Sequence, residues 1–231
     1  VNQLLATNNV LGAVVTNSIF NFNGGTLITS NASDRYAANI VIQTNPVTGG
    51  GNYDIKGSWT MLGGTNRINM LFVQAGYIHG YVYFGGSGGA SNNNTILVTN
   101  GATWDLAGSM LSFQAKSNQL IIADGGQVLS TANVSIAGSS NSAWVIGTGS
   151  VWSAASSMNI SAGSLIVSNG GTVCTAPYPN NKSSVLVTGP GSAVTSSAGM
   201  FIGQASHSNT VTVANGARLV CSYTAIGAGA G

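Results

Sequence analysis

A short unit of apolar and polar positions recurs along the second half of the chain. Each copy has three consecutive, mostly apolar residues, a glycine three positions later, and a large apolar residue three positions after that glycine. The glycines of the successive copies are Gly101, Gly125, Gly149, Gly170, Gly191 and Gly216, which places the copies 24, 24, 21, 21 and 25 residues apart. A period of about 20–50 residues is typical of solenoids and other repeat architectures.

The residue types within the unit predict short strands joined by tight turns. Asn or Asp directly precedes the glycine in four copies, at Asn100, Asp124, Asn169 and Asn215. These side chains tolerate the left-handed backbone conformation and bond to their own backbone in turns. A propeller blade would need about 40–45 residues, and a β-sandwich would not need the same turn in every repeat. The sequence therefore predicts an all-β protein, a right-handed parallel β-helix (β-solenoid) with coils of about 21–25 residues.

The repeat divides the chain into two parts of one continuous solenoid. Residues 1–94 carry the unit loosely and are expected to form irregular N-terminal coils, whereas residues 95–231 form regular repeats. One coil cannot bury its apolar side alone, so stacked coils share a core. The residues expected to face that core are Ile96, Val98, Trp104, Leu120, Ile122, Val128, Trp144, Ile146, Trp152, Leu165, Val167 and Val173.

The aromatic residues leave two interpretations open. Trp104 and Trp152 occupy the same position of the unit two copies apart, where they would stack in the core or form an outer row that binds sugar rings. Tyr77, Tyr81 and Tyr83 are candidates for contact with a glycan or a partner.

Two cysteines complete the set of conspicuous side chains. Cys174 and Cys221 are expected to be free, mostly buried side chains on opposite faces of their strands, because they stand at different offsets in their repeats.

The charge content excludes several classes of function. Only ten of 231 residues are charged, and the six cations are scattered singly. Nucleic-acid binding, which neutralises phosphates with clustered Lys and Arg, is therefore not expected. No apolar run approaches the roughly 18 residues of a membrane-spanning helix. An uncharged surface rich in Asn, Ser and Thr favours self-association instead.

The sequence contains no recognisable catalytic or metal-binding set. The acidic residues are Asp34, Asp54, Asp105 and Asp124, of which the last stands at a turn position usually held by Asn. Glycoside hydrolysis generally needs two carboxyl groups within a few ångströms, and these four lie at non-equivalent positions. His79 and His207 have no further ligand at metal-binding spacing. We expect no enzyme, no cofactor and no metal.

Two segments of the repeat resemble a known group of bacterial surface proteins. The repeats of autotransporter-like proteins, including those that carry a PEP-CTERM sorting tail, are similar to two alternating segments of this chain. These segments are Gly147-Thr148-Gly149-Ser150-Val151-Trp152 and the run from Leu165 to Val173. The segment Phe22-Asn23-Gly24-Gly25-Thr26-Leu27 resembles the leading segment of such proteins. The resemblance implies a parallel β-helix, secretion, and an extracellular or cell-surface location. It supplies no catalytic residue.

These observations together predict a non-enzymatic extracellular structural protein, a β-solenoid subunit of a surface fibre that assembles end to end with further copies of itself. The uncharged strands near the two ends are expected to make that contact, with Leu5 and Ile226 as the residues involved. The alternative is an adhesin or glycan-binding module that binds a surface polysaccharide through an aromatic and Asn/Thr-rich outer face.

Overall fold

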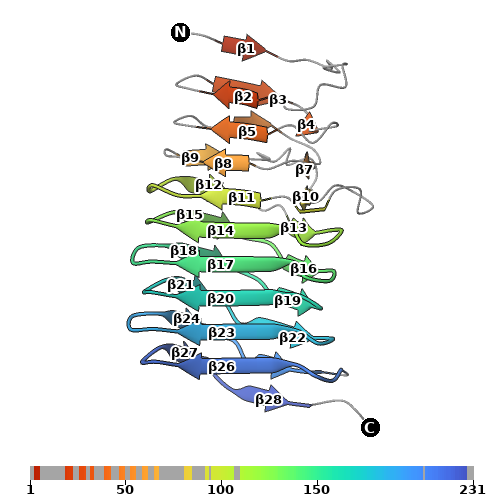
Figure 1. The fold of residues 1–231 in the computed structure, drawn as a ribbon, viewed down its shortest axis with the longest axis vertical. Coiled ribbons are helices and arrows are strands. Elements are labelled where there is room, and N and C mark those ends of the chain that lie inside the picture. Colours follow the sequence, from red (N-terminus) through yellow and green to blue (C-terminus); the bar gives the residue numbers. More distant parts are fainter. Residues whose placement is uncertain are drawn as a thin grey trace.

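The computed structural model of the chain is a stack of β-coils, each built from three short strands (Figure 1). In the first part of the chain the structure describes the backbone of the strands and the side chain of Phe84. From there on it describes residues 92–93, 95–106, 110–204 and 206–227. Within these residues the chain forms strands and turns and no helix, which confirms the all-β prediction.

One side of the coil forms a nine-stranded parallel sheet, called here the first sheet. Its strands, in spatial order, are β2 (Ile19–Phe22), β5 (Asn39–Ile42), β8 (Trp59–Met61), β11 (Thr95–Val98), β14 (Gln119–Ala123), β17 (Ser142–Ile146), β20 (Ser164–Ser168), β23 (Ser184–Thr188) and β26 (Thr210–Ala214).

The other two sides of the coil form seven-stranded parallel sheets. The second sheet contains β9 (Thr65–Arg67), β12 (Thr103–Asp105), β15 (Gln127–Ser130), β18 (Val151–Ala154), β21 (Thr172–Cys174), β24 (Ala193–Thr195) and β27 (Arg218–Val220). The third sheet contains β4 (Ala32–Ser33), β7 (Tyr53–Ile55), β10 (Tyr81–Phe84), β13 (Met110–Phe113), β16 (Val134–Ala137), β19 (Met158–Ser161) and β22 (Pro177–Asn180). Two smaller sheets are formed by β1 (Gln3–Leu5), β3 (Thr26–Thr29) and β6 (Val47–Gly49), and by β25 (Met200–Ile202) and β28 (Thr224–Ile226).

Successive coils pair in register, residue on equivalent residue. Along the first sheet, paired residues from Thr95 to Thr210 are 24, 23, 22, 20 and 26 residues apart. This spacing confirms the parallel β-solenoid and widens the expected coil length slightly. The right hand of the coil stays a prediction.

The turns between the first and second sheets are of two kinds. Three-residue turns begin with Asp124, Asn169 or Asn215, each at a positive φ of 47–53°. Four-residue turns run through Gly147–Ser150 and Gly189–Ser192 and end in a buried serine.

The serine of each four-residue turn connects two coils. The Ser150 hydroxyl donates to the Ile146 carbonyl (2.7 Å) and accepts from the Gly125 N–H of the preceding coil (3.2 Å). Ser192 repeats both contacts with Thr188 and Gly170. The four-residue turn therefore satisfies, through its serine, backbone groups that would otherwise be buried without a partner.

A corner rich in asparagine joins the third sheet back to the first. Asn118 and Asn141 are fully buried at equivalent positions, and the Asn118 N–H donates to the Asn141 side-chain oxygen (2.8 Å). The two amide NH₂ groups donate to carbonyl oxygens of their own corners, at Gln114 and Ala137. Ser183 and Asn209 continue the row two coils later, where Asn209 accepts from the Ser183 N–H (3.1 Å). Buried amides of this kind are stable only because each is fully hydrogen-bonded.

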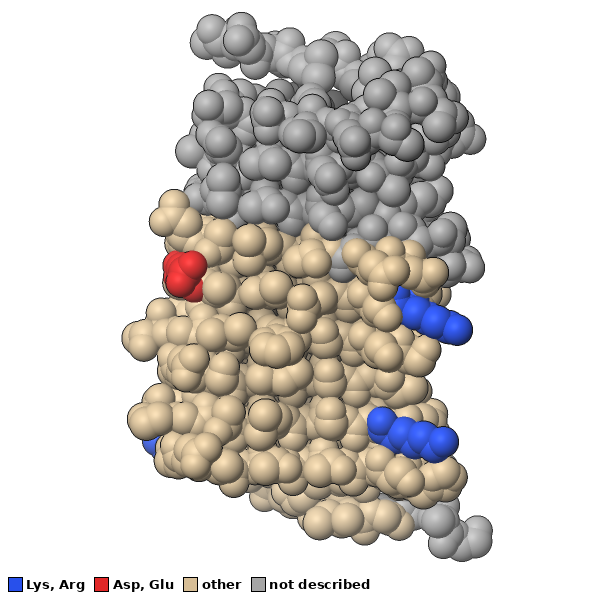
Figure 2. All heavy atoms as spheres, in the orientation of Figure 1, with Lys and Arg blue, Asp and Glu red and all other residues tan. Residues whose placement is uncertain are grey.

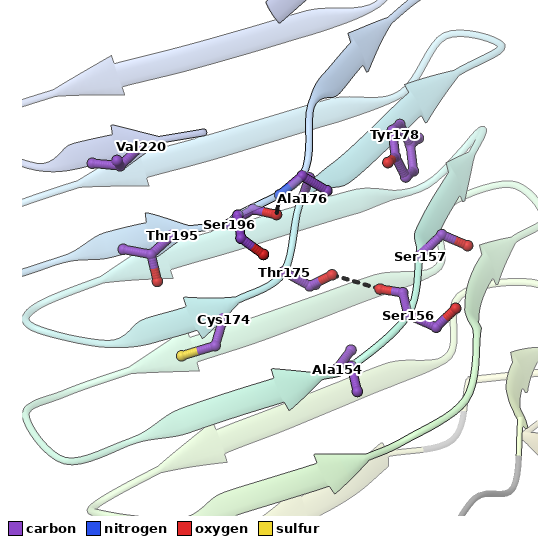
Figure 3. A pocket seen from close by; sticks show the side chains of 13 residues that line it. Ala154, Ser156, Ser157, Cys174, Thr175, Ala176, Tyr178, Thr195, Ser196 and Val220 are labelled. Atoms are coloured by element: carbon purple, nitrogen blue, oxygen red, sulfur yellow. Dashed lines mark hydrogen bonds between the residues drawn. The ribbon is translucent and has the colours of Figure 1, made fainter. Parts of the chain in front are cut away.

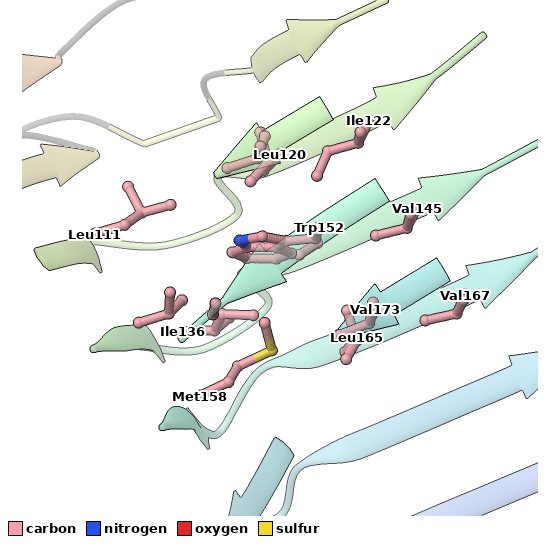
Figure 4. Close-up of a cluster of buried hydrophobic side chains, with 14 of the residues drawn as sticks. Leu111, Leu120, Ile122, Ile136, Val145, Trp152, Met158, Leu165, Val167 and Val173 are labelled. Atoms are coloured by element: carbon pink, nitrogen blue, oxygen red, sulfur yellow. The ribbon is translucent and has the colours of Figure 1, made fainter. Parts of the chain in front are cut away.

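The core fills the space between the three sheets with rows of apolar side chains from all three: two rows each from the first and third sheets and one row of large side chains from the second (Figure 4). The second sheet contributes Trp104, Val128, Trp152 and Val173, which stack on one another in consecutive coils. In the coil that buries Trp152, the first sheet has the small Ala143 at its inward position. The neighbouring coils have Leu120 and Leu165 at the equivalent position. Such exchange of volume keeps the interior close-packed.

The predicted core is confirmed except at two residues. Trp144 and Ile146 were expected to face inward, but they are half-buried on the outer face, and Ala143 and Val145 are fully buried in their place. The cause is the turn length. The turn after β17 holds one residue more than the turn after β20, so counting back from Gly149 misses the inward positions by one. A shift of one residue in a strand exchanges its two faces.

Two prolines end the third sheet at β22. Pro177 and Pro179 pair with β19 on one side, and on the other side the Pro179 carbonyl accepts from the Gly203 N–H of the next coil (2.9 Å). Proline has no N–H to donate, so β22 cannot complete a ladder with the following strand. The next two strands, β25 and β28, accordingly form a sheet of their own.

The two tryptophans of neighbouring strands provide a matched test of the coil's inward and outward positions. Replacing the buried Trp152 with Ala should lower the free energy of unfolding by about 3–5 kcal/mol, because it leaves a cavity in the core. Replacing the outward Trp144 with Ala should cost about 1 kcal/mol or less. Chemical denaturation of both variants measures the difference, and a larger loss for Trp144 would mean that the assignment of faces is inverted.

Candidate functional site

The tyrosines predicted to contact a ligand lie at the edge of the described part of the chain. Tyr81 and Tyr83 belong to β10, whose backbone pairs with β7 and β13, and their side chains lie outside the described residues. Tyr77 and His79 also lie outside them. Their proposed contact with a glycan or partner stays a prediction.

Trp104 and Trp152 belong to the core. Both are fully buried, which decides between the two interpretations of their spacing and excludes them from an outer sugar-binding row. Among the residues that the structure describes, their indole N–H groups have no hydrogen-bond partner. The rings therefore act as large apolar filling for a narrow solenoid.

A groove of about 550 Å³ runs along the corner between the second and third sheets (Figure 3). It crosses four coils, because its lining comes from the ends of β18, β21 and β24 with the segments that follow them, and from Val220 at the end of β27. Buried Ala154, Thr175 and Ala176 form part of it. Hydroxyl groups are prominent in the lining, from Ser156, Ser157, Thr195, Ser196 and Ser197. A volume in this range is typical of ligand sites, which span about 300–1,000 Å³.

An outer row of aromatic rings begins at this groove. Tyr178 lines it and stacks on Phe201 of the next coil, with ring centroids 5.7 Å apart and planes 30° apart. Phe201 in turn meets the ring of Tyr223 edge to face at 5.4 Å. The Tyr223 ring lies on Gly199, where a Cβ would come within 2.2 Å of a ring carbon. The three rings form a surface that extends over three consecutive coils.

Reasoning from the sequence missed this row, although a signal was present. Tyr178, Phe201 and Tyr223 are 23 and 22 residues apart, which is close to the length of one coil. The repeating unit was defined by its glycines, and the three aromatics lie outside it. The unit therefore does not predict the row.

The described ionisable residues are dispersed along the coil. Asp124 is a turn residue, as expected, and its carboxylate accepts from the Thr99 hydroxyl of the preceding coil (2.9 Å). Asp105 lies in β12, and His207 is exposed in the corner after β25. Within the described residues, no three His, Cys, Asp or Glu side chains are grouped in a way that could hold a metal ion.

The last described coil exposes apolar side chains that earlier coils bury. Val213 pairs with the fully buried Val187, yet it is 44% exposed. Ile226 of β28 is 77% exposed. Leu5, the other residue expected at an end contact, lies in β1, which pairs with β3, and its side chain is outside the described residues. Within the described residues, no further coil covers the apolar side chains of the coil from Thr210 to Ile226.

The outer face of the first sheet carries a row of apolar residues. Leu97, Ile121, Trp144, Ile166 and Leu186 pair in succession and are each half-buried. On the face shown in Figure 2, the charged side chains of the described part stand near the edges. An apolar row flanked by uncharged residues is the kind of surface expected to contact another molecule.

The cysteines differ from the prediction. Both are free, but Cys174 is exposed and lines the groove, and Cys221 is half-buried with its sulfur 3.1 Å from the Thr224 hydroxyl. Val173 takes the inward position of β21, so the following residue, Cys174, points outward. The expectation of two mostly buried thiols is wrong for Cys174.

Comparison with protein-family models, with curated proteins and with solved structures finds no match to this chain. The resemblance to autotransporter-like surface proteins therefore stays a prediction that depends on the residues of the repeat. In the described part of the chain, no helix is long and apolar enough to cross a membrane.

The outward orientation of Cys174 can be checked on the folded protein. A thiol reagent such as DTNB should modify the native Cys221→Ser variant quickly, because only the exposed Cys174 remains. The Cys174→Ser variant should react more slowly, because the half-buried Cys221 is less accessible. Absorbance at fixed pH follows both reactions. Modification of Cys174 only after unfolding would contradict the orientation of β21.

Proposed function

We propose that the protein is a non-enzymatic, extracellular structural protein whose β-solenoid forms a subunit of a surface fibre. Its copies would join end to end, so that the last coil of one copy stacks on the first coil of the next. The function is then mechanical: the molecule extends a stiff rod away from a surface. The resemblance of its repeats to those of bacterial surface proteins agrees with this location.

The observation that carries this proposal is the exposure of apolar side chains on the coil from Thr210 to Ile226, the last coil that the structure describes. Val213 and Ile226 occupy positions that the stacking of one further coil would cover, and β26, β27 and β28 are each the outermost strand of their sheet. An outermost strand presents unpaired N–H and C=O groups, which natural proteins usually block with charge, proline or a covering segment. Arg218 is the one charged residue within these three strands.

A contact between unlike ends extends into a filament. Because the N-terminal and C-terminal coils are different surfaces, their contact is heterologous, and such contacts propagate unless rotation closes them into a ring. Each added coil would continue the three parallel ladders with a rise of about 4.8 Å. The apolar outer row of the first sheet, from Leu97 to Leu186, provides a second surface for packing rods side by side.

Charge at the end coil should prevent assembly. The Ile226→Lys variant should remain monomeric at concentrations at which the wild type forms filaments, because each contact would bury an unpaired ammonium group. Leu5→Lys should have the same effect from the other end. Asn159→Lys is the control, since Asn159 is exposed in a central strand, β19, away from both end coils.

Light scattering and negative-stain microscopy of all four proteins provide the measurement. Filaments in the wild type and in Asn159→Lys, with monomers in the two end variants, would support the proposal. A wild type that stays monomeric at high concentration would overturn it. So would filaments of Ile226→Lys that are as long as those of the wild type.

A further inference from the structure

The groove between the second and third sheets has the composition of a site for an uncharged, hydroxyl-rich ligand. None of the thirteen described residues that line it is charged. A phosphate or carboxylate ligand would leave its charge without a counter-charge there. The lining instead offers neutral hydroxyl groups, which both donate and accept hydrogen bonds.

Two of these hydroxyl groups are free to bind a ligand. Thr195 and Ser197 are exposed, and their side-chain hydroxyl groups make no hydrogen bond within the described part of the chain. Others are already bonded: Thr175 donates to the Ser156 carbonyl (2.7 Å), and Ser157 donates to the Asn133 side chain (3.1 Å). The bonded groups hold the lining in place, while the exposed hydroxyls remain directed to solvent.

The aromatic row supplies the second half of such a site. Tyr178 lies at the groove, and Phe201 and Tyr223 continue the row, one ring per coil. The face of a sugar ring that carries its C–H bonds is apolar, and it would pack on the part of the Tyr178 ring that the stacked Phe201 does not cover. Hydroxyls in the groove would then bond the sugar's own hydroxyl groups at the ring's edge.

We propose that this groove and its aromatic row bind a neutral polysaccharide chain. The chain would lie along the solenoid axis and contact equivalent groups of successive coils, which are spaced about 4.8 Å apart. This inference is independent of fibre assembly, because the groove belongs to a single copy of the protein. In an assembled fibre the same site would recur in every copy and would hold a polysaccharide by many weak contacts.

Binding can be measured by calorimetry with cellohexaose and mannohexaose as neutral probes and hexagalacturonate as an acidic one. We expect a neutral probe to bind and the acidic one to bind more weakly or not at all. Tyr178→Ala should raise the Kd about tenfold, whereas Tyr178→Phe, which keeps the ring, should stay near the wild-type value. Trp144→Ala removes an outward aromatic from a different sheet and should leave the Kd unchanged.

A second pair of variants avoids any loss of ring packing. Ser197→Arg places a long charged side chain at an exposed position in the groove and should abolish binding, whereas Thr212→Arg makes the same change on the outer face of the first sheet and should not. Thermal unfolding verifies that each variant is folded. No binding of either neutral probe, a preference for hexagalacturonate, or equal loss in Ser197→Arg and Thr212→Arg would overturn the proposal.

Discussion

The in-register hydrogen bonding of each strand to its equivalent in the next coil is the constraint on which the rest of this structure depends. Because β20 lies between β17 and β23 in the same register, every inward residue meets an inward residue above and below it. The core must then be a set of rows, and the turns must keep those rows aligned. The coils differ in length by several residues, so the turns absorb the difference. Gly147–Ser150 accommodates its additional residue with two glycines at positive φ, and Ser150 hydrogen-bonds to the preceding coil.

The same constraint orders the outside of the molecule. A residue type that recurs once per coil becomes a continuous row on the surface, as the apolar row of the first sheet and the rings of Tyr178, Phe201 and Tyr223 show. A ladder that fixes every row also leaves unpaired edges wherever stacking stops. The in-register pairing therefore underlies both proposals. Assembly into a fibre depends on the unpaired outermost strands, and glycan binding depends on the rows of equivalent side chains on the surface.

The period, the parallel solenoid and the Asx-Gly turns could be predicted because each leaves a local mark in the sequence. The inward and outward positions could not be predicted in every coil, since they depend on turn length: Trp144 and Ile146 were misplaced by one additional turn residue. The groove has no local signal, because its lining comes from four separate segments. Pro177 and Pro179 explain the interruption of the third sheet only because the Pro179 carbonyl faces the next coil, and the sequence does not show which way it faces. Sequence thus predicts the repeated part of the coil well and its exceptions poorly.

X-ray fibre diffraction from aligned wild-type filaments tests the central claim most directly, because it reports the direction of the strands within the assembly. If copies stack coil upon coil, the strands lie across the filament and the spacing between coils runs along it. We expect a reflection at about 4.8 Å on the axis of the filament. The same reflection at right angles to that axis would show that rods associate only side by side, and would contradict end-to-end stacking.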